Sequence, residues 1–370
     1  MNAEIICLYA FDIAQEADLP RIEALVTGTA EQVRLGHLKD APPGFPMYRP
    51  IAIRDEAMPA EGPHGPVTLF ASVKLFAVGA MSIKVRLPVA CEHIADLQAH
   101  RNLLFTDGGA LEQRVIGIAR QVFEKVKPGL DTPVPELPPP ERYTVFCIST
   151  PFPAEAGGDS DCAAWLRKHE RAVAALLVGE PEPTRLSQQE VQDTAKCWYS
   201  YYQRDLAVID WDAALLIDAP EDYNDTLYVI EMANLQLEEL RVYDQKLDSV
   251  LDKAYADVER AAPSYAFGER QRVLRELREI RMDMTKVSDE ISNITKFFGE
   301  WHLARIYMGC AERFHLAEWE NMVSQKLRAL DGLYTMLQQD STSRALLILD
   351  AAIVGLFVID LVVIILLGLR

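Results

Sequence analysis

The sequence predicts an α+β fold: N-terminal mixed α/β domains, then long antiparallel helices that form a coiled-coil stalk, and one C-terminal transmembrane helix. Three observations carry this prediction. The first 220 residues hold short apolar runs of strand length. Residues 226–339 carry apolar side chains at steps of three and four, the heptad pattern of packed helices. Residues 345–369 are apolar apart from two aspartates.

The N-terminal part is predicted to hold two α/β units. Apolar runs predict strands at residues 4–13, 67–76, 81–89, 143–149 and 204–218, and helical spacings predict helices at 94–104 and 110–126. A proline-rich stretch lies between these groups, and proline fits neither a helix interior nor a central strand. We therefore expect domains at 1–130 and 143–222, joined by a linker at 131–142.

The stalk is predicted over residues 223–340, where the heptads continue through three helices. Apolar residues such as Ile230, Leu237 and Leu247 occupy core positions of the first helix, and Asp244 is the exception in that series. A polar residue at a single core position fixes register or partner number at a cost in stability. We therefore expect Asp244 to set the register of the coiled coil.

The segment 345–369 is expected to cross a membrane once. Its 25 residues would form a helix of roughly 37 Å, against a hydrocarbon core of about 30 Å. The N-terminus has no charged region followed by an apolar core, as a secretory signal would have, and Lys326, Arg328 and Arg344 precede the segment. We therefore expect a single-pass protein of the bacterial inner (cytoplasmic) membrane, with its N-terminal body in the cytoplasm.

Four residues of this segment are candidate contacts with a second copy or with the membrane. Asp360 would stand at the middle of the span, where an ionisable group indicates an ion or proton site or a polar contact between helices. Ala351 and Gly355 have the spacing of small residues that lets helices approach closely. Asp350 would lie at the cytoplasmic interface. Both interpretations of Asp360 imply more than one copy of the chain.

The composition argues against several classes of function. A net charge of -18 disfavours binding to nucleic acid. The six cysteines form no C-x-x-C pair, and the chain lacks phosphate-binding, dinucleotide-binding and nucleophile-elbow motifs. His302 and His315 are 13 positions apart, too far to form an H-E-x-x-H site. We therefore predict no catalytic residue, no metal site and no cofactor.

Three stretches of the C-terminal part resemble a known family. They are YVIEMANLQLEELRVYD (228–244), TKFFGEWHLARIY (295–307) and KLRALDGLY (326–334). From residue 205 to the end, their pattern and order resemble the proteins named as required for meiotic nuclear division, which carry a domain of unknown function and occur in mitochondria and bacteria. The resemblance implies a membrane-anchored, self-associating helical protein without established enzyme activity. Where those proteins place a Glu-Trp pair, this chain has Asp350 and Ala351.

These observations predict a non-enzymatic, membrane-anchored homo-oligomeric scaffold that presents cytosolic α/β domains. Its expected partners are further copies of itself, the lipid bilayer through residues 345–369, and an unknown protein at the cytosolic domains, with no nucleic acid. The alternative is an ion-conducting or transport oligomer of CorA-like architecture with Asp360 in the pore. Against it, the sequence has neither a second membrane helix nor a Gly-Met-Asn loop. A third possibility is a hydrolase in the first 220 residues, but no sequence motif supports it.

Overall fold

The computed structural model describes residues 2–26, 30–32, 50–62, 64–101, 103, 105, 108–149, 161–220, 223–259, 282, 301–333, 353–357 and 359. The chain divides into two compact units. The first comprises Met1–Val242 and Thr285–Trp319, and the second comprises Tyr243–Met284 and Glu320–Arg370.

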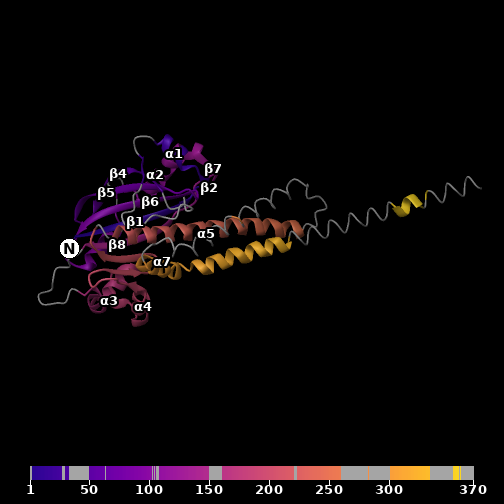
Figure 1. Ribbon diagram of the computed structural model, residues 1–370. Helices are drawn as coiled ribbons and strands as arrows, with labels where there is room; N and C mark the ends of the chain where they lie inside the picture. The colour runs from indigo at the N-terminus through magenta and orange to yellow at the C-terminus, as the bar shows by residue number, and fades with distance from the viewer. Residues whose placement is uncertain are drawn as a thin grey trace, which may run out of the picture. The chain divides into compact units, whose positions relative to one another are not determined.

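A nine-stranded sheet forms the centre of the first unit (Figure 1). Its strands, in spatial order, are β3 (Ala30–Gln32), β4 (Ile51–Gly62), β5 (Gly65–Leu75), β6 (Ala80–Ala90), β1 (Asn2–Asp12), β8 (Glu141–Ser149), β11 (Ala213–Asp218), β10 (Leu206–Ile209) and β9 (Trp198–Tyr199). β8 and β11 are parallel, and the other neighbours are antiparallel. Separately, β2 (Ala14–Ala17) pairs with β7 (Leu130–Pro133).

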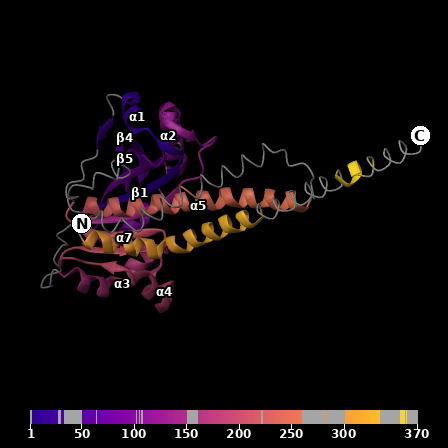
Figure 2. The same cartoon turned by 45° about the vertical axis from the view of Figure 1, so that its right-hand side comes forward.

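The described helices flank the strands along the chain, and capping residues mark the ends of some of them. They are α1 (Leu19–Leu25), α2 (Leu111–Val126), α3 (Cys162–Val178), α4 (Gln188–Ala195), α5 (Tyr223–Glu259) and α7 (Trp301–Arg313), a helix at 316–333, and the 3₁₀ helices η2 (Ile94–His100), η3 (Lys127–Gly129) and η4 (Pro183–Arg185). Asp161 and Ser187 accept backbone N–H groups at the starts of α3 and α4. Gly179, in the left-handed region at φ 79°, ends α3. Figure 2 shows α3 beside α4 and α1 beside α2.

The central strand β1 is buried on both of its faces. Alternate residues of a strand point to opposite sides, and Ile5, Cys7 and Tyr9 belong to the core that also holds residues of α2 and α3. The other side contacts α5, because the Tyr223 hydroxyl donates to the Glu4 carboxylate at 2.8 Å. We call these the first face and the second face of the sheet.

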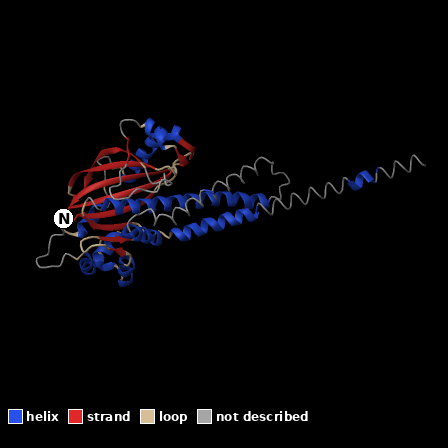
Figure 3. Cartoon of the chain, in the orientation of Figure 1, coloured by secondary structure: helices blue, strands red, loops and turns tan. Residues whose placement is uncertain are grey.

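Several expectations about the first unit are confirmed. The structure is a mixed α+β sheet domain followed by helices, with strands and helices that Figure 3 distinguishes by colour. However, β1 pairs with β6 on one side and with β8 on the other. Residues before and after the segment 131–142 therefore contribute strands to one shared sheet.

The predicted transmembrane helix is corrected by the structure. Within the part of the chain that the structure describes, no helix is long and apolar enough to cross a membrane. This finding contradicts the single-pass assignment and the inner-membrane localisation that depended on it. Asp350, Ala351 and Asp360 lie outside the described residues, and Gly355 lies among the described helical residues 353–357.

In the second unit, one lysine joins two helices. Lys326 Nζ, on the helix at 316–333, lies 2.6 Å from Asp244 Oδ1 and 2.6 Å from Asp248 Oδ1, both on α5. Asp244 and Asp248 are one helical turn apart, so a single ammonium group reaches both carboxylates. The polar residue at the core position therefore has its partner within the same chain. Whether Asp244 sets the register of a coiled coil stays a prediction.

Candidate functional site

A small pocket lies on the first face of the sheet. Its cavity volume is about 10 Å³, room for roughly one water-sized group. Six aliphatic side chains form most of its wall: Ile5, Leu69, Val85, Leu87, Leu103 and Leu111. Five residues with polar side chains complete it: Cys7, His100, Arg101, Arg142 and Thr144. We call this site the arginine pocket.

Strand register places the floor of the arginine pocket. Cys7 on β1 pairs with Val85 on β6 and with Thr144 on β8. Arg142 precedes Thr144 by two positions, so the period of two puts both side chains on the first face. Arg142 therefore stands on the helix-covered face of β8, near the start of the strand, where its side chain is exposed.

Arg101 reaches the pocket from the residue that follows η2. Its Nη1 donates to the Leu176 carbonyl oxygen at 3.0 Å, and its guanidinium carbon lies 5.9 Å from the centre of the Phe146 ring. Gly179 leaves room for this arrangement, because a Cβ atom there would collide with the Arg101 guanidinium. The end of α3 thus holds Arg101 in place.

The two arginines have no carboxylate partner in the described part of the chain. Arg86, Arg241 and Arg313 each form an ion pair, with Glu4, Glu141 and Asp210 respectively. Neither Arg101 nor Arg142 does so among the described residues. Burial lowers the pKa of Arg101, and repulsion from Arg142 lowers it further, which places the two guanidinium groups close together. The pocket therefore concentrates positive charge.

Neighbouring groups compensate part of this charge through space. Although burial acts to lower the pKa of Arg142, interactions with Tyr9, Cys7 and Glu112 raise it. Burial raises the pKa of the Cys7 thiol, against the opposing effect of Arg142, so the thiol is neutral at pH 7. Burial and Asp210 raise the pKa of Asp212, while Arg101 and Arg142 act in the opposite direction. Asp212 thus acts on the arginines through space, without an ion pair among the described contacts.

His100 is held by a backbone contact. Its Nδ1 lies 3.0 Å from the Asp96 carbonyl oxygen. A carbonyl oxygen only accepts, so Nδ1 carries a proton in this contact. The chemistry available at this site is the binding of a negatively charged group by two guanidinium forks. A neutral thiol is no activated nucleophile.

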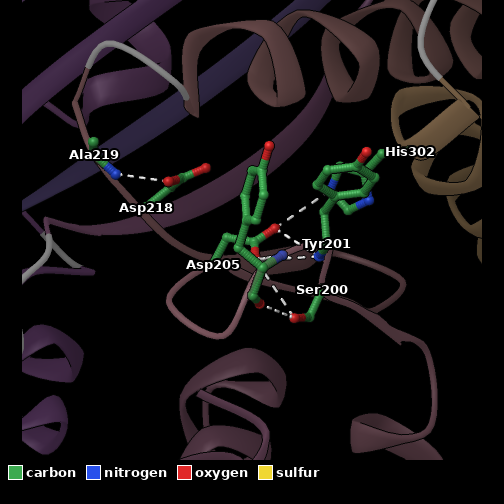
Figure 4. A network of polar contacts seen from close by, with 7 residues as sticks. Ser200, Tyr201, Asp205, Asp218, Ala219 and His302 are labelled. Atoms are coloured by element: carbon green, nitrogen blue, oxygen red, sulfur yellow. Dashed lines mark hydrogen bonds and ion pairs between the residues drawn. The ribbon is translucent and has the colours of Figure 1, made fainter. Parts of the chain in front are cut away.

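A second polar cluster surrounds Asp205 (Figure 4). The Asp205 carboxylate accepts the Tyr201 N–H at 2.8 Å and the Tyr202 N–H at 2.5 Å, and His302 Nε2 lies 3.6 Å from it. The Ser200 hydroxyl donates to the Tyr202 carbonyl oxygen at 2.5 Å.

Serine, histidine and aspartate occur together in this cluster, but their connections differ from those of a catalytic triad. In a triad the histidine takes the serine proton, whereas the Ser200 hydroxyl is directed to a backbone carbonyl and to Asp205. In Figure 4, Asp218 contacts the neighbouring Ala219 N–H, at 2.8 Å. The Asp205 cluster therefore fastens the loop before β10 to α7.

The acidic residues between 210 and 225 do not form a metal site in the described structure. Asp210 pairs with Arg313 from α7, and Asp218 accepts the Ala219 N–H. No group of three histidine, cysteine, aspartate or glutamate residues in the described ranges could hold a metal ion. His302 and His315 lie apart, since His302 contacts Asp205 and His315 lies 3.5 Å from Glu318.

Sequence reasoning missed both arginines of the pocket. One signal was present at Arg142, which lies in the strand ERYTVFCIS, where the period of two places it on the same face as Thr144 and Phe146. A charged residue on a buried strand face is a reason to look for its partner. Arg101 had no such signal, because it follows a 3₁₀ helix and reaches the pocket only through the tertiary fold.

The sequence profile of a family described as "Uncharacterized protein MJ0711, N-terminal domain" matches residues 2–223, which include the whole arginine pocket. The uncharacterized protein MJ0711 of Methanocaldococcus jannaschii is 24% identical over 223 residues. That match covers 60% of this chain and 65% of the relative, less than two thirds of its length. No solved structure matches the chain.

These matches do not link the chain to the family required for meiotic nuclear division, so that resemblance stays a prediction. The profile match extends from β1 through β11 and covers more than half of the 370 residues. The chain therefore belongs to the MJ0711 N-terminal domain family.

Proposed function

We propose that the sheet domain binds a small anion in the arginine pocket, and that the protein acts through this binding without transforming its ligand. One observation carries the proposal: Arg101 and Arg142 converge on one cavity without an ion-pair partner among the described residues. Arg101 is half-buried and Arg142 is exposed, and holding the two guanidinium groups close together costs electrostatic repulsion that water screens only in part. A bound anion would offset that cost, and each guanidinium offers a planar fork of donors for it.

The overall charge supports a ligand site over an accidental cluster. The chain carries a net charge of -18, so its average surface repels anions. Two neighbouring arginines create a local positive potential that attracts anions despite this negative background. The aliphatic side chains that line the cavity lower the local dielectric constant and strengthen the electrostatic interaction with an anion bound against them.

Thermal unfolding with and without small anions at constant ionic strength tests this proposal. We expect acetate, chloride or phosphate to raise the unfolding midpoint of the wild-type protein, because a ligand that binds only the folded state stabilises it. Arg101→Gln and Arg142→Gln should abolish the rise. Arg120→Gln, on the exposed side of α2, is the matched control and should retain it. A midpoint that no anion moves would contradict the proposal.

We also propose, as a second role, that the helices of the second unit associate with another copy of the chain. The support is the helix pair joined by Lys326, together with the exposed side chains of Tyr255 and Met322 on its two helices. Exposed apolar side chains on paired helices are typical of interaction surfaces. Light scattering of the purified protein tests this role. We expect a dimer or larger species that Met322→Glu dissociates, and a monomer at all concentrations would exclude it.

A further inference from the structure

We infer that the anion held in the arginine pocket is a single-atom halide, chloride or bromide. This inference rests on the proposed anion binding and deepens it by naming the ligand class. Four features of the pocket lead to it: its size, its donors, its charge and its lining.

The size of the pocket limits the ligand to one small group. The cavity volume is about 10 Å³, room for roughly one water-sized group. A chloride ion is a single sphere only slightly larger than a water molecule. Acetate, phosphate and sulfate each join several heavy atoms and exceed this space. A polyatomic anion could therefore contact the exposed Arg142 from outside, but it would not enter the cavity.

Arg101 supplies the more buried of the two charges. Its side chain is half-buried, and its Nη1 donates to the Leu176 carbonyl oxygen at 3.0 Å. Its other N–H groups have no hydrogen-bond partner among the described residues. The guanidinium group is thus held in position by the end of α3 and keeps donors for an ion.

Thr144 and Cys7 add neutral donors at the floor of the pocket. Thr144 is 3% exposed, and it lies opposite Cys7 in the register of β1 and β8. A hydroxyl hydrogen rotates to suit its partner, and a thiol is a weak donor. A spherical ion accepts hydrogen bonds from any direction, so it suits donors that come from two strands and from the residue after η2.

The charge of the pocket suits a monovalent ion. Arg142 contributes positive charge from an exposed position, where water screens it in part. Asp212 acts electrostatically on Arg101, and Glu112 acts on Arg142. These two carboxylates already offset part of the positive charge. A single negative charge therefore meets less repulsion here than a dianion would.

The aliphatic lining selects among the halides. An ion that enters the cavity gives up water on the sides that face Ile5, Leu69 and Leu87. The cost of removing an ion from water falls as its radius increases, so fluoride loses more hydration energy than chloride or bromide does. Iodide is larger than the space. The pocket should therefore prefer chloride and bromide to both fluoride and iodide.

The line width of the chlorine NMR signal tests the inference on the full chain, because a bound chloride ion relaxes faster than a free one. Sodium bromide, fluoride, acetate and phosphate serve as competitors, with sodium gluconate keeping the ionic strength constant. We expect the protein to broaden the signal and bromide to remove the broadening at about the chloride concentration. Fluoride and acetate should need about tenfold more, a difference of about 1.4 kcal/mol in binding free energy.

Two results of this competition would contradict the inference in different ways. If acetate or phosphate removes the broadening as readily as bromide, or raises the unfolding midpoint when halides do not, the halide assignment is overturned and anion binding stands. If no anion broadens the signal, competes or moves the midpoint, anion binding and the inference both fail.

Two substitutions of Arg142 ask whether the ligand needs a charge or a planar fork of donors. The side chain is exposed, so both variants should fold. Lysine keeps the charge as a single ammonium group and loses the fork. We expect Arg142→Lys to weaken chloride binding only about threefold and Arg142→Gln to weaken it at least tenfold. Equal losses in the two variants would indicate a ligand that needs the fork, such as a carboxylate, and would overturn the inference.

A buried hydroxyl provides the last test. Thr144→Val removes the hydroxyl and keeps the shape of the side chain, and we expect it to weaken chloride binding at least about tenfold, the factor for a hydrogen bond to a charged group. Thr194→Val is the matched control, a threonine of α4 that is 1% exposed and lies outside the pocket lining, and it should keep the broadening. Wild-type broadening in a folded Thr144→Val protein would overturn the inference. If that variant does not fold, the competition series and the Arg142 pair decide.

Discussion

The two faces of the sheet treat buried charge in opposite ways. On the second face, Glu231 of α5 is 1% exposed and accepts the Ser82 hydroxyl at 2.6 Å, while Lys74 forms an ion pair with it. On the first face, Arg101 and Arg142 line a cavity with no such partner among the described residues. A fully buried charge needs a partner to be tolerated, and Glu231 and Lys74 supply one another within the chain. On the first face Arg101 is half-buried and Arg142 is exposed, and the proposed anion would be their counter-charge.

The largest expected effect comes from breaking the pair on the second face. We predict that Glu231→Gln lowers the free energy of unfolding by about 3–5 kcal/mol, because Lys74 then stays buried without its counter-charge. Urea denaturation followed by circular dichroism measures this change.

The control for this prediction is an exposed pair on the first face. Lys127 lies 3.4 Å from Glu124, and both side chains are largely exposed. Glu124→Gln should cost less than about 1 kcal/mol, the usual value for a surface ion pair. Equal losses in the two variants would remove the energetic basis of the comparison.

The second prediction concerns Glu238, the exception on the second face. Burial raises its pKa to about 8, and Asp12 adds to the rise. The folded state therefore keeps a proton that the unfolded state releases above about pH 4.5. Stability should consequently fall as the pH rises from about 4.5 through 8, by on the order of 3 kcal/mol when relaxation of the site is allowed for. We predict that the stability of Glu238→Gln does not decrease in this way over the same pH range.

Urea denaturation at pH 5, 6, 7 and 8 measures how the free energy of unfolding changes with pH in the wild-type protein and in Glu238→Gln. The contribution of Glu231 to stability depends on pH in the opposite direction. Burial acts to raise its pKa, but Lys74, Lys84 and the hydrogen bonds from Lys74 and Ser82 lower it. Its contribution is present above about pH 4.5 and is lost below that value. Glu136→Gln, an exposed control, should keep the wild-type slope, and a wild-type slope in Glu238→Gln would refute the prediction.

The third prediction sharpens the description of the first face. Gly179→Ala should cost about 1–2 kcal/mol, because alanine is strained at φ 79°. The new methyl group would also displace the Arg101 guanidinium. We therefore expect weaker anion binding in addition to the loss of stability, measured by calorimetry and denaturation. Gly108→Ala, at φ 77° in open space, is the matched control and should lose stability without losing binding.

The smallest expected effect is on the stability of the ligand-free protein when a pocket arginine is removed. We predict that Arg142→Met changes the free energy of unfolding by less than about 1 kcal/mol, since Arg142 is exposed and forms no ion pair among the described residues. The same variant should abolish the stabilisation by anions. A loss of several kcal/mol would show that Arg142 has a structural partner and that the two faces are alike.

Sequence patterns were informative where an element depends on local periodicity. The short apolar runs at residues 4–13 and 143–149 predicted β1 and β8, and the helical spacing in 110–126 predicted α2. The strand β4 was missed, because Asp55, Glu56 and Pro59 interrupt its apolar pattern. It forms by pairing with β5 across a register shift, which is a tertiary effect.

Composition alone was misleading near the C-terminus, and it could not reveal the pocket. The apolar segment 345–369 predicted a membrane span, whereas no helix of the described structure has the length and apolarity that a span requires. Arg101 and Arg142 are far apart in the sequence and meet only because β8 joins β1 while η2 packs over the same face. Such long-range proximity leaves no fixed spacing in the sequence for a motif to capture.

Cys7, on the floor of the arginine pocket, gives the site its own kinetic reporter. A thiol reagent reaches a buried cysteine only when the structure around it opens. The rate of Cys7 modification therefore measures the frequency of opening on the first face, and an occupied pocket slows it in proportion to ligand occupancy. Cys147 faces the other side of the same sheet and gives a parallel rate for the second face. The modification rates of the two thiols thus report how often each face of the sheet opens, in one sample.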